Sequence, residues 1–276
     1  KKVDARLYYR KQRKFHKDII EKNKNKKYDY IFSNENITKE SLLDYKRVFP
    51  NAKLVLYLDD SVANMRGVND NFKFYDRVLT FDRKDAQDFK IIFRPLFFCD
   101  TFRELNEKNV KEIYDICFIG TCHSDRLTII DKIMSKYPKI NYYFYCYLQG
   151  WFMYYYYRFS DSEYKKKDKE FFAYDQMSMA SVSEKMAEAR VILDIQHPKQ
   201  TGLTMRTIET LGLGKKIITT NEDIKNYDYY NPNNVLVIDR HDPVIEESFI
   251  NSPYQPIDTS LYYKYSIEGW IEDVFV

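Results

Sequence analysis

The regular alternation of strand-like and helix-like segments constrains the fold of this chain more than any other feature. Short apolar runs rich in β-branched and aromatic residues, such as 53–58 (KLVLYL), predict buried strands. Longer segments between these runs carry apolar residues at helical spacing, as Val3, Leu7, Phe15 and Ile19 do near the start. Strands that alternate with helices form parallel sheets with crossover helices. The sequence therefore predicts the α/β class.

The first series of alternating elements extends to about residue 98. It contains predicted helices at 3–22, 38–49 (with Thr38 as N-cap) and 82–89, predicted strands at 28–33, 53–58 and 77–81, and an extended piece at 91–98. Pro95 places this last piece at a sheet edge or outside the sheet, because proline cannot donate a ladder hydrogen bond. Doubly wound domains usually open with a strand and a glycine-bearing turn. This series opens with a helix, so we expect that an N-terminal piece with the first strand is missing from the sequence.

A second series follows a polar stretch without periodicity, which predicts a linker at 101–112. Its predicted strands lie at 114–120, 140–148, 191–195, 216–220 and 234–238, and its predicted helices at 124–137, 183–190 (with Ser181 or Ser183 as N-cap), 203–213 and 243–250. The segment 150–172 allows no clear assignment. We therefore expect two doubly wound Rossmann-like domains, at 1–100 and 113–258, which face a cleft and are followed by a helical tail at 259–276.

Bulk properties narrow the class of protein. A chain of 276 residues is long enough for two α/β domains. With 44 basic and 41 acidic residues the formal net charge is +3, and such a balance does not call for a nucleic-acid partner. The cysteines form no C-x-x-C pair, and there is neither a signal peptide nor a membrane-spanning apolar run. These features predict a cytoplasmic protein with reduced thiols, which could also lie at the inner face of the cell membrane.

The segment 191–221 carries the most informative chemistry. It is predicted as a strand, a polar loop at 197–202, a helix, a glycine turn and a strand. Backbone amides at the start of such a helix, at the positive end of its dipole, can hold a diphosphate. Lys199 and Arg206 would add positive charge, and Glu209 could accept two hydrogen bonds from a ribose diol. Arg206 and Glu209 could instead simply pair with each other, since they are three residues apart on one helix.

This segment resembles the nucleotide-sugar motif of the GT-B glycosyltransferases, especially the bacterial surface-polysaccharide (capsule and lipopolysaccharide) enzymes of the group 1 type. The family carries Gly-Leu, five further residues and Glu, then a glycine turn and a strand; here these are Gly202, Leu203 and Glu209. A strand and glycine turn at 118–121, followed by Arg126, is similar to the turn that lines the donor phosphates in the family. The resemblance implies a donor site formed by Gly120, Thr121, Arg126, His197, Lys199, Gln200, Thr201, Gly202, Leu203, Thr204, Arg206 and Glu209.

The resemblance also implies the substrates. The donor would be a nucleoside-diphosphate sugar, and the acceptor a glycan or a lipid-linked glycan. We expect no bound metal and no other cofactor. Two further hypotheses remain: an enzyme of the same fold with another reaction (a sugar-nucleotide epimerase or a polyol-phosphate transferase), and a non-catalytic protein that binds sugar nucleotides or nucleic acid.

Acidic residues after predicted strands of the first series are candidates for the catalytic base. An inverting transfer needs a carboxylate or a histidine that reaches the acceptor hydroxyl. Asp60 is the first candidate, Asp59 the second and Glu35 the third, because each follows a predicted strand. The alternative is that one of the aspartates caps the next helix. His123 could contact the donor or be exposed, and His16 is expected to be solvated.

An aromatic stretch at 142–157 is followed by lysines at 165–167. Aromatic rings beside lysines suit a peripheral membrane contact or a lipid-linked acceptor. They also suit base stacking, although we expect no nucleic-acid partner. The simplest alternative is a set of core tyrosines next to a solvated run of lysines.

Overall fold

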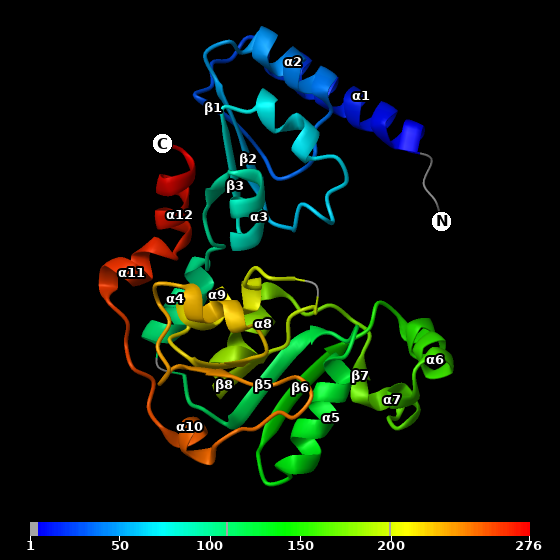
Figure 1. Cartoon of the computed structure of the whole chain (residues 1–276), viewed down its shortest axis with the longest axis vertical. Coiled ribbons are helices and arrows are strands. Elements are labelled where there is room, and N and C mark those ends of the chain that lie inside the picture. The colour runs from blue at the N-terminus through cyan, green and yellow to red at the C-terminus, as the bar shows by residue number, and fades with distance from the viewer. Residues whose placement is uncertain (1–4, 109, 199) are drawn as a thin grey trace. The chain divides into compact units, whose positions relative to one another are not determined.

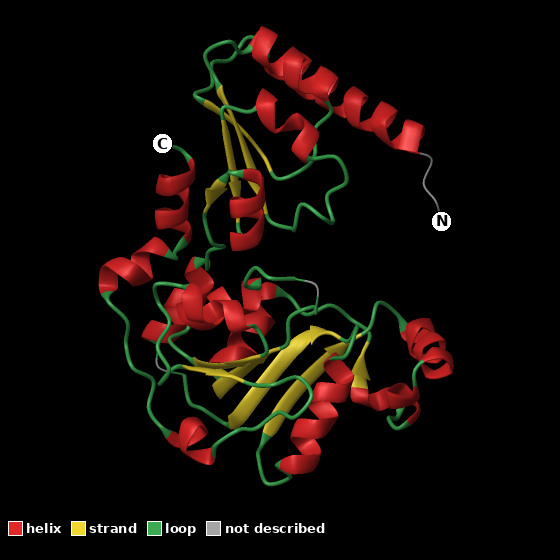
Figure 2. Cartoon of the chain, viewed as in Figure 1, coloured by secondary structure: helices red, strands yellow, loops and turns green. Residues whose placement is uncertain are grey.

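The computed structural model describes residues 5–108, 110–198 and 200–276. The chain divides into two compact units. The first, here called the N-unit, contains the described residues up to Leu96 together with Trp270–Val276, and the second, the C-unit, contains the described residues of Phe97–Gly269. Figures 1 and 2 show that each unit has a sheet with helices packed around it. The predicted α/β class is confirmed.

The N-unit contains a parallel sheet with the strand order β1-β2-β3-β4. The strands are β1 (Tyr30–Ser33), β2 (Lys53–Leu58), β3 (Arg77–Thr80) and β4 (Ile92–Phe93). From Leu54 to Leu58 every side chain of β2 is buried, as expected of a central strand with both faces covered. The N-unit sheet therefore follows the strands that the apolar runs predict.

Three helices precede or connect these strands. They are α1 (Ala5–Asn23), α2 (Lys39–Val48) and α3 (Arg83–Phe89), with a 3₁₀ helix at Asn69–Phe74. Thr38 caps α2 as predicted, because its side chain accepts a hydrogen bond from the backbone amide of Ser41. His16, which we expected to be solvated, is only 6% exposed and lies 3.0 Å from the hydroxyl of Tyr45. That prediction was wrong because α2 covers the face of α1 on which His16 lies.

The C-terminal residues complete the N-unit. The Trp270 ring packs edge-on against Tyr57, with 4.8 Å between the ring centroids. The carboxylate of Asp273 lies 2.8 Å from Nε of Arg94, whose side chain is buried. The last residues of the chain thus pack against β2 and the segment after β4.

The C-unit contains a six-stranded parallel sheet with the order β10-β9-β8-β5-β6-β7. The strands are β5 (Tyr114–Thr121), β6 (Tyr142–Tyr147), β7 (Phe172–Ala173), β8 (Ala189–Asp194), β9 (Lys216–Thr219) and β10 (Val235–Val237). The order changes direction between β5 and β8, which are neighbours in the sheet. In doubly wound folds ligands bind at such a switch point, outside the carboxyl ends of the strands.

The helices of the C-unit connect and cover these strands. They are α4 (Asp100–Glu107), α5 (Arg126–Lys136), α6 (Trp151–Ser160), α7 (Ser162–Lys165), α8 (Met179–Ala187), α9 (Met205–Gly212), α10 (Glu247–Asn251) and α11 (Thr259–Lys264), with 3₁₀ helices at Lys169–Phe171 and Glu222–Asn226. A last helix, α12 (Ile267–Val274), runs from the C-unit into the N-unit. Among the described residues, no helix combines the length and the apolar character needed to cross a bilayer.

Several predicted elements of the C-unit were placed wrongly. The predicted linker at 101–112 largely forms helix α4, whose Phe102 is buried. Helix α8 begins four residues earlier than predicted. Its N-cap is Ser178, whose side chain accepts a hydrogen bond from the amide of Ser181, rather than Ser181 or Ser183. The unassigned segment at 150–172 contains α6 and α7. Short helices with few buried residues show too little apolar periodicity to be recognised from sequence.

Candidate functional site

The loops after β5, β8, β9 and β10 meet at the carboxyl edge of the C-unit sheet. The guanidinium of Arg126, at the start of α5, donates through Nε to the carbonyl of Ile195 (2.6 Å) after β8. A second hydrogen bond from Arg126 reaches the carbonyl of Thr121 (2.8 Å) at the end of β5. Burial lowers the pKa of Arg126, although Asp194 nearby raises it. One arginine thus ties together the two strand ends at the switch point of the sheet.

Gly120 belongs to strand β5 rather than to a turn. The strand continues to Thr121, and Gly120 pairs with Cys146 of β6. A Cβ at Gly120 would lie 3.1 Å from Cζ of Phe118 and 3.6 Å from the Arg126 guanidinium. The predicted glycine turn is therefore wrong in its position. The turn follows later, where Ser124 adopts a positive φ of 51°.

Two histidines face each other above this edge. The rings of His123, after β5, and His197, after β8, have centroids 5.6 Å apart. Burial, the nearby Arg126 and His197 lower the pKa of His123 to about 4. His123 is therefore neutral near pH 7, and one of its ring nitrogens can donate a hydrogen bond while the other accepts one. Nδ1 of His123 lies 3.1 Å from the hydroxyl of Ser124.

Helix α9 begins at Met205, two residues later than predicted, and its N-cap is Thr204. The Thr204 hydroxyl accepts from the amide of Thr207 and donates to Asp194 Oδ1 at 3.0 Å. The Thr207 hydroxyl donates to the other carboxylate oxygen of Asp194 at 2.8 Å. Asp194 is 4% exposed, so β8 anchors the first turn of α9 from below. The predicted donor residue Thr204 thus has a structural role as the helix cap.

The loop before α9 is held from the next strand. The Asn221 side-chain amide, after β9, donates to the carbonyls of Thr201 (3.0 Å) and Gly202 (3.3 Å). Gln200 donates through its side chain to the Gly202 carbonyl at 3.2 Å. Leu203 is buried, whereas Thr201 is exposed. Of the predicted donor residues in this loop, Lys199 lies outside the described residues.

Arg240, after β10, connects four parts of this edge. It forms two hydrogen bonds with the carboxylate of Asp125 (3.0 and 2.8 Å), the residue before α5. It also donates to the Thr220 hydroxyl and to the Gln196 carbonyl, both at 2.9 Å. The Asp125 pKa is lowered, because the hydrogen bonds and charge of Arg240 outweigh burial. This network fixes the loops that carry His123 and His197.

Arg206 and Glu209 form an ion pair on α9. Their Nη1 and Oε2 atoms are 2.6 Å apart, and the two side chains are 20% and 12% exposed. Arg206 also contacts the sulfur of Met186, while its Nε is buried and has no hydrogen-bond partner. Burial raises the pKa of Glu209, although Arg206 lowers it. The alternative that these two residues pair with each other is therefore what the structure has, and Glu209 keeps a second oxygen for a ligand.

Asp59 and Asp60 lie at the carboxyl end of β2 in the N-unit, and both are exposed. Asp60 Oδ1 accepts from the amide of Ser61 (2.8 Å) and from the side chain of Asn64 (2.9 Å). Asp60 therefore caps a turn rather than the helix that the alternative interpretation expected; the next helical segment begins only at Asn69. Asp59 accepts from the side-chain amide of Asn34 at 3.0 Å.

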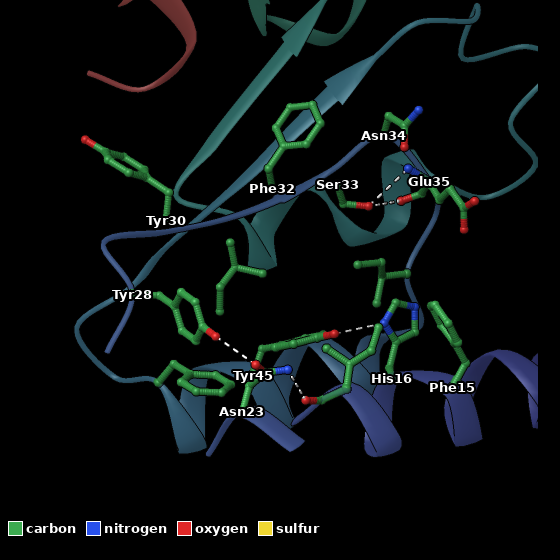
Figure 3. Close-up of a pocket in the computed structure, with 14 residues that line it drawn as sticks. Phe15, His16, Asn23, Tyr28, Tyr30, Phe32, Ser33, Asn34, Glu35 and Tyr45 are labelled. Carbon is green, nitrogen blue, oxygen red and sulfur yellow. Dashed lines mark hydrogen bonds between the residues drawn. The ribbon is translucent and has the colours of Figure 1, made fainter. Parts of the chain in front are cut away.

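A cavity of about 420 Å³ in the N-unit lies between β1 and the helices α1 and α2 (Figure 3). Aromatic rings line most of it, and the third base candidate, Glu35, lies at its edge together with Ser33 and Asn34. The Ser33 hydroxyl and the backbone amide of Glu35 are 3.0 Å apart. His16 points toward Tyr45, and burial lowers its pKa. Glu35, at the cavity, and Asp60, at its turn, are therefore distinct features of the N-unit. They follow the neighbouring strands β1 and β2.

Sequence reasoning found some residues of the C-unit edge and missed others. It named Thr121, Arg126, His197 and Glu209, all of which the structure places at or behind this edge. It missed the polar residues that hold the loops, namely Asp125, Asp194, Gln196, Asn221 and Arg240. Asp194 could have been found as an acid at the end of an apolar strand. The partners of Arg240 are far apart in sequence and left no local signal.

The chemistry of the C-unit edge suits an anionic ligand. The cationic guanidinium of Arg126, the neutral imidazole of His123 and the start of a helix meet there, and each can bind oxygen atoms that carry negative charge. The Glu209 carboxylate can accept hydrogen bonds from hydroxyl groups. Among the residues that the structure describes, no three His, Cys, Asp or Glu side chains gather so that they could hold a metal ion.

Comparison with known proteins relates this chain to solved structures. No protein-family model and no curated protein matches the sequence. HepE of Anabaena, solved with UDP and glucose, aligns over 94% of this chain and 79% of its own, with a TM-score of 0.57 and 11% identity. The N-terminal domain of Candida albicans trehalose-6-phosphate phosphatase aligns over 99% and 76%, with a TM-score of 0.60 and 11% identity. The lipopolysaccharide outer core galactosyltransferase WaaB aligns over 98% and 80%, with a TM-score of 0.52 and 8% identity.

These similarities cover nearly the whole chain, so they include both sheets. HepE and WaaB are GT-B glycosyltransferases. At such low identity they establish the architecture, in which two Rossmann-like domains follow each other along the chain. The chain therefore has the fold of the GT-B glycosyltransferases.

Proposed function

We propose that this protein transfers a sugar from a nucleoside-diphosphate sugar to a hydroxyl group of a glycan or a lipid-linked acceptor in bacterial surface-polysaccharide synthesis. The observation that carries the proposal is the contact between the β5 and β8 loops at the switch point of the C-unit sheet. There Arg126 bonds the Ile195 carbonyl, and the His123 and His197 rings lie side by side. In doubly wound folds this is the position where nucleotides bind.

Uridine is the base and a hexose the sugar that we propose for the donor. HepE, which shares the fold, was solved with UDP-glucose, and WaaB is named as a galactosyltransferase. The diphosphate would lie between Arg126 and the start of α9, and the ribose diol would reach the free oxygen of Glu209. An epimerase or a binding protein would use the same nucleotide site, so the transfer to an acceptor is what separates the proposal from these two hypotheses.

The leaving group determines which residues matter for the rate. When the glycosidic bond to the diphosphate breaks, negative charge grows on the phosphate oxygens, and cations and hydrogen-bond donors already in place stabilise it. Arg126 is such a cation, because its two hydrogen bonds to backbone carbonyls fix its position. We propose that these groups take the role that a divalent metal has in other transferases. Transfer should then persist in the presence of a chelator.

In an inverting transfer the acceptor hydroxyl must lose its proton to a base. We propose Asp60 for this role and Asp59 as the second candidate. Asp60→Asn is a sharp variant, because asparagine keeps the Oδ1 that accepts from Ser61 and Asn64. The turn should survive while the base is lost.

The test measures UDP release and sugar transfer from UDP-hexoses to membrane glycolipid extracts, with and without a chelator. Asp60→Asn is expected to lower kcat by about 10²–10⁴-fold with donor affinity unchanged. Asp59→Asn is the matched variant: it should retain most of the activity if Asp60 is the base, and the reverse pattern would assign the role to Asp59. Full activity in Asp60→Asn would remove Asp60 from the mechanism. If UDP-hexoses turn over without an acceptor to give an epimer, glycosyl transfer is the wrong reaction.

A further inference from the structure

Helix α6 of the C-unit exposes an unusual number of aromatic side chains. Five rings form what is here called the aromatic face, with exposed fractions of 68% for Trp151, 56% for Phe152, 47% for Tyr155, 63% for Tyr156 and 89% for Phe159. Figure 1 shows α6 at the outer edge of the C-unit, beyond the edge strand β7. On a helix that faces only water, these positions would normally be polar.

The five rings are exposed although helix α6 is firmly packed on the C-unit. At about 100° per residue, the five rings occupy one continuous side of α6. The opposite side is anchored: Tyr154 is 5% exposed and donates to the Lys167 carbonyl at 2.9 Å. Tyr157 stacks on the ring of Tyr164 with 4.9 Å between the centroids. The helix is therefore fixed to the C-unit with its aromatic face outward.

The kinds of side chain on this face indicate what covers it. It contains tryptophan, tyrosine and phenylalanine, and no aliphatic residue. Tryptophan and tyrosine have an apolar body and a polar tip, and they are enriched where lipid headgroups meet the hydrocarbon. Tryptophan and tyrosine are also enriched at protein–protein contacts, so the charges around the face decide between the two kinds of partner.

The charges around the aromatic face complement an anionic surface. Arg158 is the one ionised side chain of α6, and it is exposed. Lys165 and Lys166 are exposed on and just after the adjoining helix α7. Of the acids close to them, Asp161 caps α7 and Glu163 lies 2.7 Å from Lys166. Glu170, which lies near Trp151 and Tyr155, is 3.8 Å from Lys169. Arg158 donates to the Tyr154 hydroxyl at 2.6 Å, but among the described residues neither Arg158 nor Lys165 pairs with a carboxylate, so their positive charges can attract lipid phosphates.

We propose that α6 is a membrane-binding element whose aromatic face inserts into the headgroup region of a bilayer that contains anionic lipids. Such a helix lies in the interface plane, with its apolar side buried to a shallow depth. This function is separate from the donor site, since none of the α6 residues belongs to it. It would bring the enzyme to the surface on which a lipid-linked acceptor is found.

The first test is flotation of the full chain with two kinds of vesicle, one of phosphatidylcholine alone and one that also contains phosphatidylglycerol. The chain should float with both and more strongly with the anionic vesicles, because basic residues add to the attraction of the rings. The double variant Trp151→Ser/Phe159→Ser should reduce partitioning about ten-fold or more, because two exposed rings no longer insert. Val244→Ser is the matched control, since Val244 is a half-exposed apolar residue elsewhere in the C-unit.

The second test uses the fluorescence of the two tryptophans. Trp151 is largely exposed and Trp270 is 6% exposed, so Trp270→Phe leaves a single reporter on the aromatic face. Vesicles should shift the emission of Trp151 to the blue, and lipids brominated near the headgroup should quench it.

Three outcomes would overturn the proposal. One is no partitioning into either vesicle. Another is partitioning that the double variant retains, provided that circular dichroism shows both proteins folded. The third is a blue shift of Trp151 that depends on protein concentration without lipid and is lost in Phe159→Ser, which keeps the reporter; it would assign the face to a second copy of the chain. Nucleotide binding should be unchanged in the double variant, so failure of membrane binding is distinguishable from failure of the donor site.

Discussion

At the scale of single residues, the C-unit edge divides into side chains that hold the loops and side chains that face a ligand. Asp194 accepts hydrogen bonds from two hydroxyl groups. Arg240 donates to a neighbouring carboxylate and to a backbone carbonyl. Such contacts fix geometry and leave little capacity for a substrate. Glu209 and His123 retain groups that can act on a ligand, and their pKa values make that role testable.

Glu209 should make nucleotide binding sensitive to acid. Burial raises its pKa above that of an ordinary glutamate, so protonation begins at a higher pH. A ribose diol donates to the ionised carboxylate, and the affinity for UDP should therefore fall as the pH decreases through this raised pKa. Isothermal titration calorimetry between about pH 4 and pH 8, which begins below the ordinary glutamate pKa of about 4.3, measures the loss.

Glu209→Gln is the matched control, because it keeps one acceptor oxygen and cannot titrate. It should bind UDP about ten-fold more weakly at neutral pH. Any acid dependence that it retains belongs to the nucleotide phosphate or to other groups. If the acid dependence is the same in both proteins, Glu209 does not contact the ribose.

His123 should report on the diphosphate directly. In the free protein its pKa is about 4, so NMR of the labelled imidazole should show no titration between about pH 5.5 and 8. A bound diphosphate stabilises the imidazolium and should raise this pKa. His123→Gln identifies the signal. A midpoint near the ordinary value that UDP leaves unchanged would place the diphosphate elsewhere.

The sequence located residues that stand in short motifs and missed those that only the fold brings together, and the roles assigned to the located residues stay predictions. Glu209 and Arg126 stand in short motifs next to glycines and strands, so their positions were visible in the sequence. Asp125 and Arg240 are separated by 115 positions, and only the sheet brings them together. The exposure of His16 was also predicted wrongly, because the helix that covers it lies further along the chain.

At the scale of elements, the sequence predicted helix α9 correctly but placed its start two residues too early. Its apolar positions and its glycines predicted the helix and the following strand β9. The start was predicted two residues early, because the cap depends on Asp194 below it rather than on local residues alone. Elements with long apolar runs, such as β2 and β5, were placed within two residues of their bounds. The short helices α4 and α6 were not.

Gly212 at the end of α9 should not tolerate a methyl group. A Cβ at this position would lie 2.6 Å from Cγ of Phe98, and Phe98 is buried and cannot move aside. Alanine is the better helix former by about 1 kcal/mol, yet Gly212→Ala should lower the free energy of unfolding by about 1–3 kcal/mol, because the overlap outweighs that gain. Chemical denaturation measures the difference.

In a Phe98→Ala background, Gly212→Ala should cost less stability than it does in the unaltered protein, because alanine lacks the Cγ and Cδ2 atoms that lie 2.6 and 2.9 Å from the added Cβ. An unchanged or increased stability of Gly212→Ala would show that α9 and the Phe98 segment are not packed as described.

At the scale of the whole molecule, the alternation of strands and helices was sufficient to predict two parallel sheets. The order of the strands was not, because it depends on which crossover helix covers which face. The division into units also differs from the predicted domains, since the described residues of 97–112 and the residues 259–269 belong to the C-unit. Trp270–Val276 belong to the N-unit, where Trp270 packs on Tyr57, although they follow the C-unit in the sequence. The packing of the C-terminal residues on the first unit depends on residues far apart in the sequence, so no local sequence pattern predicts it.

The central claim is that the carboxyl edge of the C-unit sheet binds the nucleotide of a sugar donor. The most direct measurement is calorimetric titration of the folded full chain with UDP, GDP, TDP, CDP and ADP, repeated with Arg126→Gln and Glu209→Ala. We predict that UDP binds in preference to the others and that each variant loses about ten-fold or more in affinity, because each removes a charged partner. No binding of any of the five nucleotides, or binding that both variants retain in full, would contradict the claim.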